Sequence, residues 1–283
     1  MSVSNPTEAS WTALDPFAQQ RRWVSDGVEL GLRRAELDGA KWRGVLGKPY
    51  LNTMVTMGRA LSRLRGQPES SPPGEDAHQV PWLPAWPRLT SAPFHDPSAV
   101  PWSRMLTNAY PAVRNELDGC IDGAMSDRFR RGIYDGFGGK PWKTLYFFVN
   151  GQRVDETHDA CPATSAILDR IPHNGMHVCF SAVEPDAALP PHVGPTNANL
   201  ILHMGLRGCH GAAIFAGDQT KRFEEGKCLI LDDSFVHGVR HTGTQTRYTL
   251  MITFWHYDAT ALERRALDQL FRLYGYLVDR ATS

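Results

Sequence analysis

The sequence lacks the features by which membrane-spanning, secreted and nucleic-acid-binding proteins are usually recognised. No window approaches the run of about 18 apolar residues that a membrane span needs. The first residues, MSVSNPTEASWTALDPF, contain no basic stretch followed by an apolar run, so we expect no signal peptide. Positive charge is not in excess, because lysine plus arginine and aspartate plus glutamate each total 30. We therefore expect neither a membrane nor a nucleic acid to be the main partner.

Cysteine is scarce and unpatterned. The five cysteines are an odd number, lie far apart and include no CxxC pair. In a chain of 283 residues this favours reduced, mostly buried thiols over a disulfide framework, and it predicts a cytoplasmic protein. The hydrophobic share of 42% is large enough for a substantial core. The sequence contains no internal repeat and gives no indication of a homo-oligomer.

The first 135 residues predict a helical region interrupted by a proline-rich arm. The arm covers about residues 66–102, where nine prolines make a regular helix or a central strand unfavourable. Tryptophans within it indicate that the arm packs on the core, since a disordered segment rarely carries such large apolar groups. Residues 103–122 predict a helix with an apolar side formed by Leu106, Val113, Leu117 and Ile121.

Residues 136–260 predict a β core. Short runs rich in aromatic and β-branched residues follow one another between turn formers: LYFFVNG, MHVCFSAV, NLILHMGL, AAIF, KCLILDD, VHGVRH and RYTLMITFW. Between the first two, CPATSAILDRIP predicts a short helix that starts near Thr164. Strands in such close succession favour an antiparallel sandwich or jelly roll, and residues 261–283 predict an amphipathic helix. The expected fold is mainly β with helical flanks.

Two of the 11 histidines, His192 and His237, are the candidate metal ligands. Each lies at the edge of a predicted strand, and a basic residue, Arg247, follows ten positions after the second. Neutral imidazole is a good ligand for iron, copper or zinc. An iron oxygenase usually adds a carboxylate two residues after the first histidine, but Gly194 occupies that position. Water, or a carboxylate from Glu184, Asp186, Asp232 or Asp233, would have to take that place; the Asp232–Asp233 pair is more typical of a turn cap.

Four stretches carry a specific resemblance. FSAVEPDAALPPHVGPTN, HMGL, FEEGKCLILDDSFVHGV and TFWHYD resemble the aspartyl/asparaginyl β-hydroxylase family, over roughly residues 142–260. The resemblance implies a double-stranded β-helix that binds iron(II) and 2-oxoglutarate and uses O2. It implies that the catalytic His192 and His237 hold the iron without a protein carboxylate, with glycine in the vacant position. It also implies that Ser181, His203 and Arg247 surround 2-oxoglutarate, whose distal carboxylate a guanidinium can hold with two parallel bonds.

The sequence departs from this family immediately after the first histidine. Two positions that are commonly arginine are Asn199 and Ile201 here. With Asn197 they are the candidate substrate pocket, and the change removes two positive charges from it. Burying an aspartate side chain without a cationic partner is costly. We therefore expect the substrate to be uncharged or partly apolar and not an aspartyl residue of a protein domain.

The expected enzyme is an iron(II)/2-oxoglutarate-dependent dioxygenase that acts on a small molecule. It would hydroxylate, desaturate or cyclise an unactivated C–H of an amino-acid- or peptide-derived metabolite. One alternative is β-hydroxylation of a peptide, a protein or a lipid acyl chain. Another is a jelly-roll binding module that has lost catalysis. A zinc hydrolase is disfavoured, because two histidines and a glycine leave zinc short of a third protein ligand.

Overall fold

The computed structural model describes residues 78–81, 85–86, 88–131 and 142–282. The predicted helices before residue 66 lie outside these residues. The elements in chain order are β1 (Phe94–His95), η2 (Pro97–Ala99), α2 (Ser103–Asp122), η3 (Ser126–Arg128), β2 (Arg130–Arg131), β3 (Trp142–Val149), β4 (Gln152–Arg153), α3 (Asp155–Ala160), α4 (Pro162–Leu168), β5 (His173–Val183), β6 (Ala187–His192), β7 (Asn199–Arg207), β8 (Ala212–Ala216), β9 (Gln219–Arg222), β10 (Cys228–Asp232), β11 (His237–His241), β12 (Arg247–Trp255) and α5 (Ala261–Thr282).

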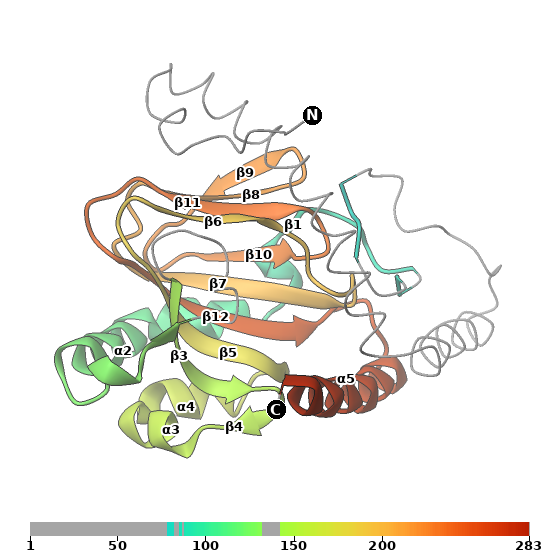
Figure 1. Cartoon of the computed structure of the whole chain (residues 1–283), viewed down its shortest axis with the longest axis horizontal. Helices are drawn as coiled ribbons and strands as arrows, with labels where there is room; N and C mark the ends of the chain where they lie inside the picture. The colour runs from blue at the N-terminus through green and yellow to red at the C-terminus, as the bar shows by residue number, and fades with distance from the viewer. Residues whose placement is uncertain (1–77, 82–84, 87, 132–141, 283) are drawn as a thin grey trace.

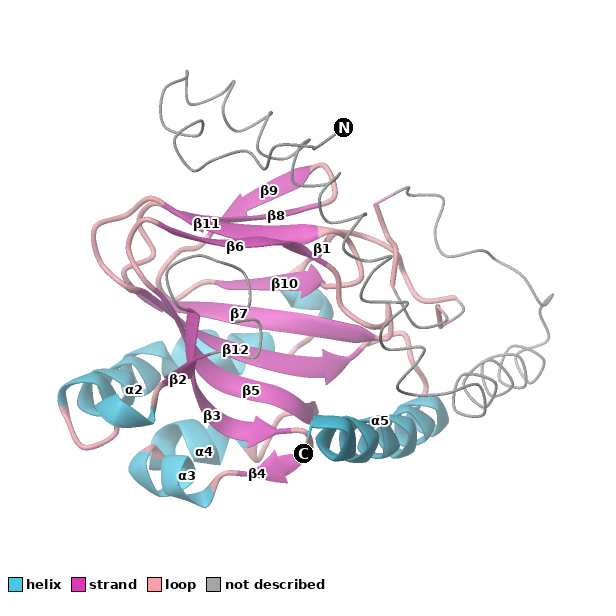
Figure 2. Ribbon diagram, viewed as in Figure 1, coloured by secondary structure: helices cyan, strands magenta, loops and turns pink. Residues whose placement is uncertain are grey.

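The strands form two antiparallel sheets. The large sheet has the order β1-β10-β7-β12-β5-β3-β2, with β4 paired to β3, and the small sheet has the order β6-β11-β8-β9 (Figure 1). Figure 2 shows the small sheet above the large one, with α2, α3 and α4 beyond the other side of the large sheet. This arrangement confirms the predicted jelly-roll class.

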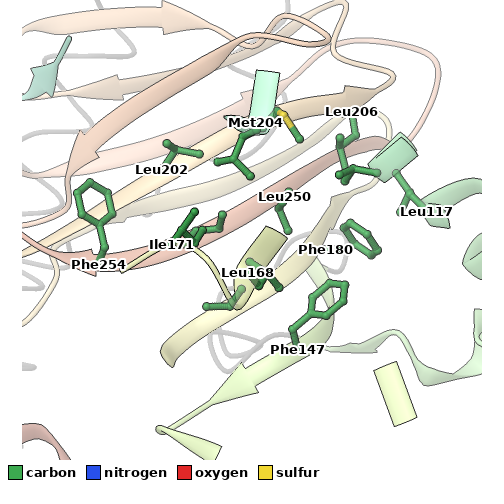
Figure 3. Packing of buried hydrophobic residues seen from close by; sticks show 14 of the residues in the cluster. Leu117, Phe147, Leu168, Ile171, Phe180, Leu202, Met204, Leu206, Leu250 and Phe254 are labelled. Atoms are coloured by element: carbon green, nitrogen blue, oxygen red, sulfur yellow. The ribbon is translucent and has the colours of Figure 1, made fainter. Parts of the chain in front are cut away.

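Side chains along the strands of the large sheet alternate between its two faces, and the two faces differ in what they contact. On β12, Leu250, Ile252 and Phe254 join the main hydrophobic core with residues of α2 and α4. Figure 3 shows this packing, which brings Leu117 of α2 close to the strands. The residues that alternate with them, such as Arg247 and Thr249 earlier in the strand, point to the opposite face, toward the small sheet, because successive side chains of a strand alternate. One face therefore builds the core, and the other is available for chemistry.

A second, smaller apolar cluster lies between the two sheets. It joins Phe94, Leu229 and Leu231 of the large sheet to Ile214 and Val239 of the small one. All five side chains are at most 9% exposed. Their contact fixes the distance between the sheets, and so the space left for side chains beside the cluster.

Two helices begin with caps that involve glutamate. The backbone N–H groups of Ala163 and Thr164 at the start of α4 donate to the Glu116 carboxylate of α2, at 2.6 and 2.8 Å. At the start of α5, Thr260 and Glu263 form a capping box: the Thr260 N–H donates to the glutamate at 2.7 Å and its hydroxyl accepts from the Glu263 N–H at 3.3 Å. The predicted helix near Thr164 is confirmed, but its cap comes from a distant helix.

Most of the predicted strands are found, and His192 lies at the end of a strand, β6, as predicted. Several short elements were not predicted: β1, η2, η3, β2, β4, α3 and β9. All five cysteines are free thiols and only Cys228 is not fully buried, as expected. Among the helices that the structure describes, none is long and apolar enough to cross a membrane.

Candidate functional site

The two candidate ligands are direct neighbours in the small sheet. His192 is the last residue of β6 and His237 is the first residue of β11, and the antiparallel register pairs them with each other. Their ring centroids lie 4.1 Å apart. A pair of imidazoles at one end of a sheet, facing the space between the sheets, is a suitable arrangement for holding one metal ion.

Each ring is oriented by a backbone carbonyl. His192 Nδ1 lies 2.8 Å from the Pro190 carbonyl oxygen, and His237 Nδ1 lies 2.9 Å from that of Phe235. Because a carbonyl only accepts, each Nδ1 must carry the proton, and the lone pair lies on Nε2. Burial, followed by the neighbouring His192, holds the pKa of His237 well below its usual value. Both effects keep the His237 imidazole neutral, the form that binds metal.

Of the four candidate carboxylates, Asp233 is the one beside Gly194. A Cβ built on Gly194 would overlap the Asp233 carboxylate, and the Gly194 N–H donates to the Asp233 carbonyl at 2.5 Å. Asp232 instead caps the turn, because its carboxylate accepts from the Ser234 N–H at 2.9 Å. Glu184 forms an ion pair with Lys143 at 2.9 Å. Asp233 therefore occupies the volume that a side chain at position 194 would need.

Burial keeps Asp233 in an unusual state. Its side chain is 8% exposed, and desolvation, followed by repulsion from Asp232, raises its pKa well above the usual value. Within the residues that the structure describes, no three His, Cys, Asp or Glu side chains are grouped so that they could hold a metal ion. The two histidines therefore remain the candidate ligands at this place, without a third such side chain grouped with them among the described residues.

Arg247 is the first residue of β12 and is buried in the space between the sheets. Its side chain is 1% exposed and its guanidinium lies over the Phe223 ring, 4.4 Å from the centroid. Nη2 donates to the Ser181 hydroxyl at 3.4 Å, and Trp142 Nε1 donates to the same oxygen at 2.8 Å. Burial lowers the pKa of Arg247 to about 10, which still leaves it charged at neutral pH. The result is a fixed cation beside a hydroxyl.

The guanidinium has unused hydrogen-bonding capacity. Within the described part of the chain, Arg247 Nε and Nη1 have no hydrogen-bond partner, and no acidic side chain forms an ion pair with them. The Thr144 hydroxyl, on the strand next to Ser181 and in register with it, is also buried without a partner. A buried unpaired cation is strongly unfavourable. These atoms therefore fit an anionic ligand that enters between the sheets.

His203 lies close to the arginine. Its ring centroid is 5.7 Å from that of Phe223, the ring beneath the Arg247 guanidinium, and its Nδ1 is 3.4 Å from the Thr249 hydroxyl. Burial, followed by the Arg247 charge, lowers the pKa of His203 to about 3. His203 is therefore neutral at physiological pH.

The three candidate pocket residues have different surroundings. The side-chain amide of Asn197 forms two hydrogen bonds with the backbone of Trp86. Asn199 accepts from Asn174 Nδ2 at 2.7 Å and donates to Asp233 at 3.5 Å. Ile201 packs against the apolar cluster between the sheets. Asn199 and Ile201 lie on the same face of β7 as His203, so the wall beside the histidines is neutral.

Sequence reasoning missed several residues of this site. Trp142, Thr144, Asn174 and Phe223 complete it from β3, from β5 and from the loop after β9. Phe223 opens the FEEGKCLILDDSFVHGV stretch, and Trp142 and Thr144 directly precede LYFFVNG, but nothing in the sequence assigned any of them a role. Their place at the site, like that of Asn174, became apparent only when the strands were paired.

The family described as aspartyl/asparaginyl beta-hydroxylase matches residues 107–257, just over half of the chain. Human aspartate beta-hydroxylase domain-containing protein 2 is 33% identical over 138 residues, which cover 46% of this chain and 37% of that protein. The ornithine lipid ester-linked acyl 2-hydroxylase of Rhizobium tropici is 30% identical over 175 residues, which cover 59% of this chain and 62% of that protein. The chain thus matches less than two thirds of the length of each relative.

Among solved structures, a prolyl hydroxylase from Trichoplax adhaerens, in complex with a peptide fragment of a hypoxia inducible factor oxygen degradation domain, aligns with 60% of this chain and 94% of that chain. The identity is 14% and the TM-score is 0.38. At that TM-score the alignment supports no functional conclusion.

Proposed function

The chain belongs to the aspartyl/asparaginyl β-hydroxylase family, and on that premise we propose that it is an iron(II)- and 2-oxoglutarate-dependent oxygenase. His192 and His237 would hold the iron through Nε2, since each Nδ1 is bonded to a backbone carbonyl. When bound, iron(II) with 2-oxoglutarate and O2 supplies oxidative decarboxylation and the insertion of oxygen into a C–H bond. The protein determines which C–H bond lies within reach.

The observation that carries the proposal is the buried guanidinium of Arg247. Two of its nitrogens have no partner in the described residues, and the Ser181 hydroxyl lies beside the third. A dicarboxylate can supply two parallel charge-assisted bonds to such a group and repay its desolvation. His203, which is coupled to both Arg247 and His237, would contact the end of the cosubstrate that is nearer the metal.

Gly194 and Asp233 would shape the surroundings of the metal. The Asp233 carboxylate, from the loop before β11, lies where a side chain at position 194 would be, so no side chain at that position would reach the metal. With its pKa raised by burial, Asp233 is a protonatable group next to the metal ligands. Its Oδ1 is buried without a hydrogen-bond partner among the described residues, so it would be available to a molecule bound beside Gly194.

The substrate that we propose is uncharged or partly apolar and small, such as an amino-acid- or peptide-derived metabolite. The amides of Asn174 and Asn199 bond to each other, and Thr253 donates to Asn174 at 2.7 Å. Ile201 adds an apolar wall. This side of the pocket offers no cation to an acidic substrate, so a carboxylate would be desolvated there without compensation.

A lipid acyl chain is the second candidate substrate. It is favoured by the relative from Rhizobium tropici, whose name describes an acyl 2-hydroxylase, and by the apolar cluster in contact with Ile201. A direct assay distinguishes the two candidate substrates. Acyl hydroxylation would add 16 mass units to a lipid, whereas a metabolite enzyme would leave lipid extracts unchanged.

Metal and cosubstrate binding can be tested together. We expect iron(II) and 2-oxoglutarate, added without oxygen, to give a weak visible charge-transfer band that is absent in His192→Ala. Admission of O2 should then release succinate, which a non-catalytic binding module would not produce. An unchanged band in His192→Ala would contradict the assignment of this ligand.

The role of Arg247 can be tested without turnover. Saturating 2-oxoglutarate should raise the melting temperature of the wild-type protein by a few degrees, because the ligand binds only the folded state. Arg247→Met should lose this response, and its ligand-free form should melt at a higher temperature, since an unpaired buried charge has been removed. Arg207→Met is the matched control, because Arg207 is half-exposed and paired with Asp118 at 2.9 Å. An equal ligand response in Arg247→Met would remove Arg247 from the site.

A further inference from the structure

The described part of the proline-rich arm, within residues 78–95, lies beside the loop that leads into His237. Gln79 forms an isolated antiparallel bridge with Phe235, flanked by two backbone hydrogen bonds of 3.0 and 2.9 Å. The Phe235 carbonyl is the group that accepts from His237 Nδ1. The arm therefore fixes the residue that orients this ring.

The side chain of Gln79 reinforces the same loop. It is 4% exposed, and Nε2 donates to Asp232 Oδ2 at 3.1 Å and to the Ser234 hydroxyl at 3.0 Å. Oε1 accepts from the hydroxyl of Ser91, also in the arm, at 2.8 Å. The amide thus links two points of the arm to the turn between β10 and β11. Its loss would leave a buried carboxylate oxygen without this donor.

A second contact of the arm lies beyond the other histidine. The Trp86 N–H donates to Asn197 Oδ1 at 2.7 Å, and Asn197 Nδ2 donates to the Trp86 carbonyl at 2.9 Å. Both residues are at most 8% exposed. Asn197 lies between His192 and the start of β7, so this two-point contact fixes the segment that leaves the first histidine.

A third contact of the arm is remote from both histidines. The N–H and hydroxyl of Thr90 donate to Asp258 Oδ2, at 2.9 and 2.6 Å. Asp258 follows β12 and lies on neither histidine-bearing loop. This contact provides a control for the general attachment of the arm.

We propose that the arm positions the two metal-binding histidines, with Gln79 and Asn197 as the positioning residues. The inference rests on the proposed function and goes beyond it, because residues 78–95 precede the 107–257 segment that the family model matches. A metal held by only two protein ligands has little else to fix the ligand loops. Hydrogen bonds from residues outside the metal site orient metal-binding histidines in general. With two protein ligands, such hydrogen bonds must hold the ligand loops in place to a greater extent.

The proposal predicts a reciprocal effect. If arm contacts favour the metal-binding geometry, metal binding must stabilise those contacts by the same free energy. Local opening of the arm would then become rarer, and the amides of Val80 and Trp86, which donate across the contacts, would exchange more slowly with solvent.

Mn(II), which does not turn over, is a suitable probe with the full chain. Its affinity in the presence of 2-oxoglutarate can be measured from the free-ion signal in electron paramagnetic resonance. We expect Gln79→Leu and Asn197→Ala to weaken Mn(II) binding by about tenfold or more, as changes around metal ligands typically do. Thr90→Val should bind within about twofold of wild type, since its partner Asp258 is remote from the histidines.

Hydrogen exchange of the wild-type chain supplies a second measurement that needs no variant to fold. Exchange of the Val80 and Trp86 amides should slow several-fold when Mn(II) and 2-oxoglutarate are added. Wild-type Mn(II) affinity in both variants, or unchanged exchange of these amides, would overturn the positioning role while leaving the proposed function intact. Failure of the wild-type chain to bind Mn(II) would overturn both.

Discussion

At the scale of single residues, Gly194 and Asp233 depend on each other. A Cβ at position 194 would overlap a carboxylate that is 8% exposed and accepts from Asn199 at 3.5 Å. The carboxylate has little room to move away. A glycine at position 194 is therefore required by a neighbour, and not by the backbone conformation.

We expect Gly194→Ala to lower the free energy of unfolding by about 1–3 kcal/mol, the usual range for overpacking a buried site. In an Asp233→Ala background the same change should cost much less, because the overlapping group has been removed. Urea unfolding of the four proteins in this double-mutant cycle measures the coupling.

Gly119→Ala is the matched control for this cycle. Gly119 lies in α2, and a Cβ there would meet nothing within 4 Å. Since alanine is the better helix former, this change should stabilise the protein by about 0.5–1 kcal/mol. Equal costs of Gly194→Ala with and without the Asp233 side chain would show that the two residues do not compete for space.

At the scale of elements, a side chain of α2 caps the N-terminus of α4. One carboxylate, that of Glu116, accepts from the Ala163 and Thr164 N–H groups and from the Thr164 hydroxyl at 2.7 Å. No side chain adjacent to α4 in sequence caps it. The two helices thus form one support beneath the large sheet.

We expect Glu116→Ala to destabilise the protein by about 1–3 kcal/mol, because it leaves donors at a helix start without their acceptor. Asp159→Ala, at an exposed position of α3, should change stability by less than about 0.5 kcal/mol. Denaturant unfolding at neutral pH compares the two. A loss no greater for Glu116→Ala than for Asp159→Ala would argue against the cap.

The element whose bounds are hardest to read from the sequence is β6, although His192 was expected at the edge of a strand. Its prolines, at positions 190 and 191, cannot donate to a central ladder, so they do not mark where the strand runs. β6 is the edge of the small sheet and pairs on one side only, with β11. An edge tolerates proline, and local sequence does not reveal which strands will be edges. The hydrophobic strands of the large sheet were predictable because both of their faces are buried.

The site was predictable in part for a similar reason. His192, His237 and Arg247 lie in stretches with recognisable spacing. The contacts around them join positions far apart in the chain, such as Gln79 and Asp232, which are separated by 153 positions. Such pairs follow from sheet order and loop packing, which one sequence does not encode locally.

At the scale of the whole molecule, buried histidines determine how stability depends on pH. Burial lowers the pKa of His95 and His177 to about 4 and that of His203 to about 3. In the unfolded chain each titrates near its ordinary value of about 6.5. The unfolded state therefore takes up more protons, and stability is lost as pH falls from about 6.5 toward 4. Asp232, whose pKa burial raises to about 7, opposes part of this loss.

We expect His95→Asn to reduce the loss of stability between pH 7 and pH 4.5 by about 2 kcal/mol, the order implied by its lowered pKa. Urea unfolding at four pH values in this range provides the measurement. His210→Asn, at an exposed position, is the control. A parallel pH profile for His95→Asn and wild type would show that His95 does not contribute.

The two-faced large sheet also restricts how the chain can change in length over evolutionary time. Deleting or inserting one residue inside β7 or β12 would turn every later side chain of that strand to the opposite face. In β7, an insertion before His203 would turn that histidine into the apolar core, and in β12, an insertion after Arg247 would turn Leu250 toward the space between the sheets. Descendants of this chain can therefore lengthen or shorten between strands, but within these strands their sequences must diverge by substitution alone.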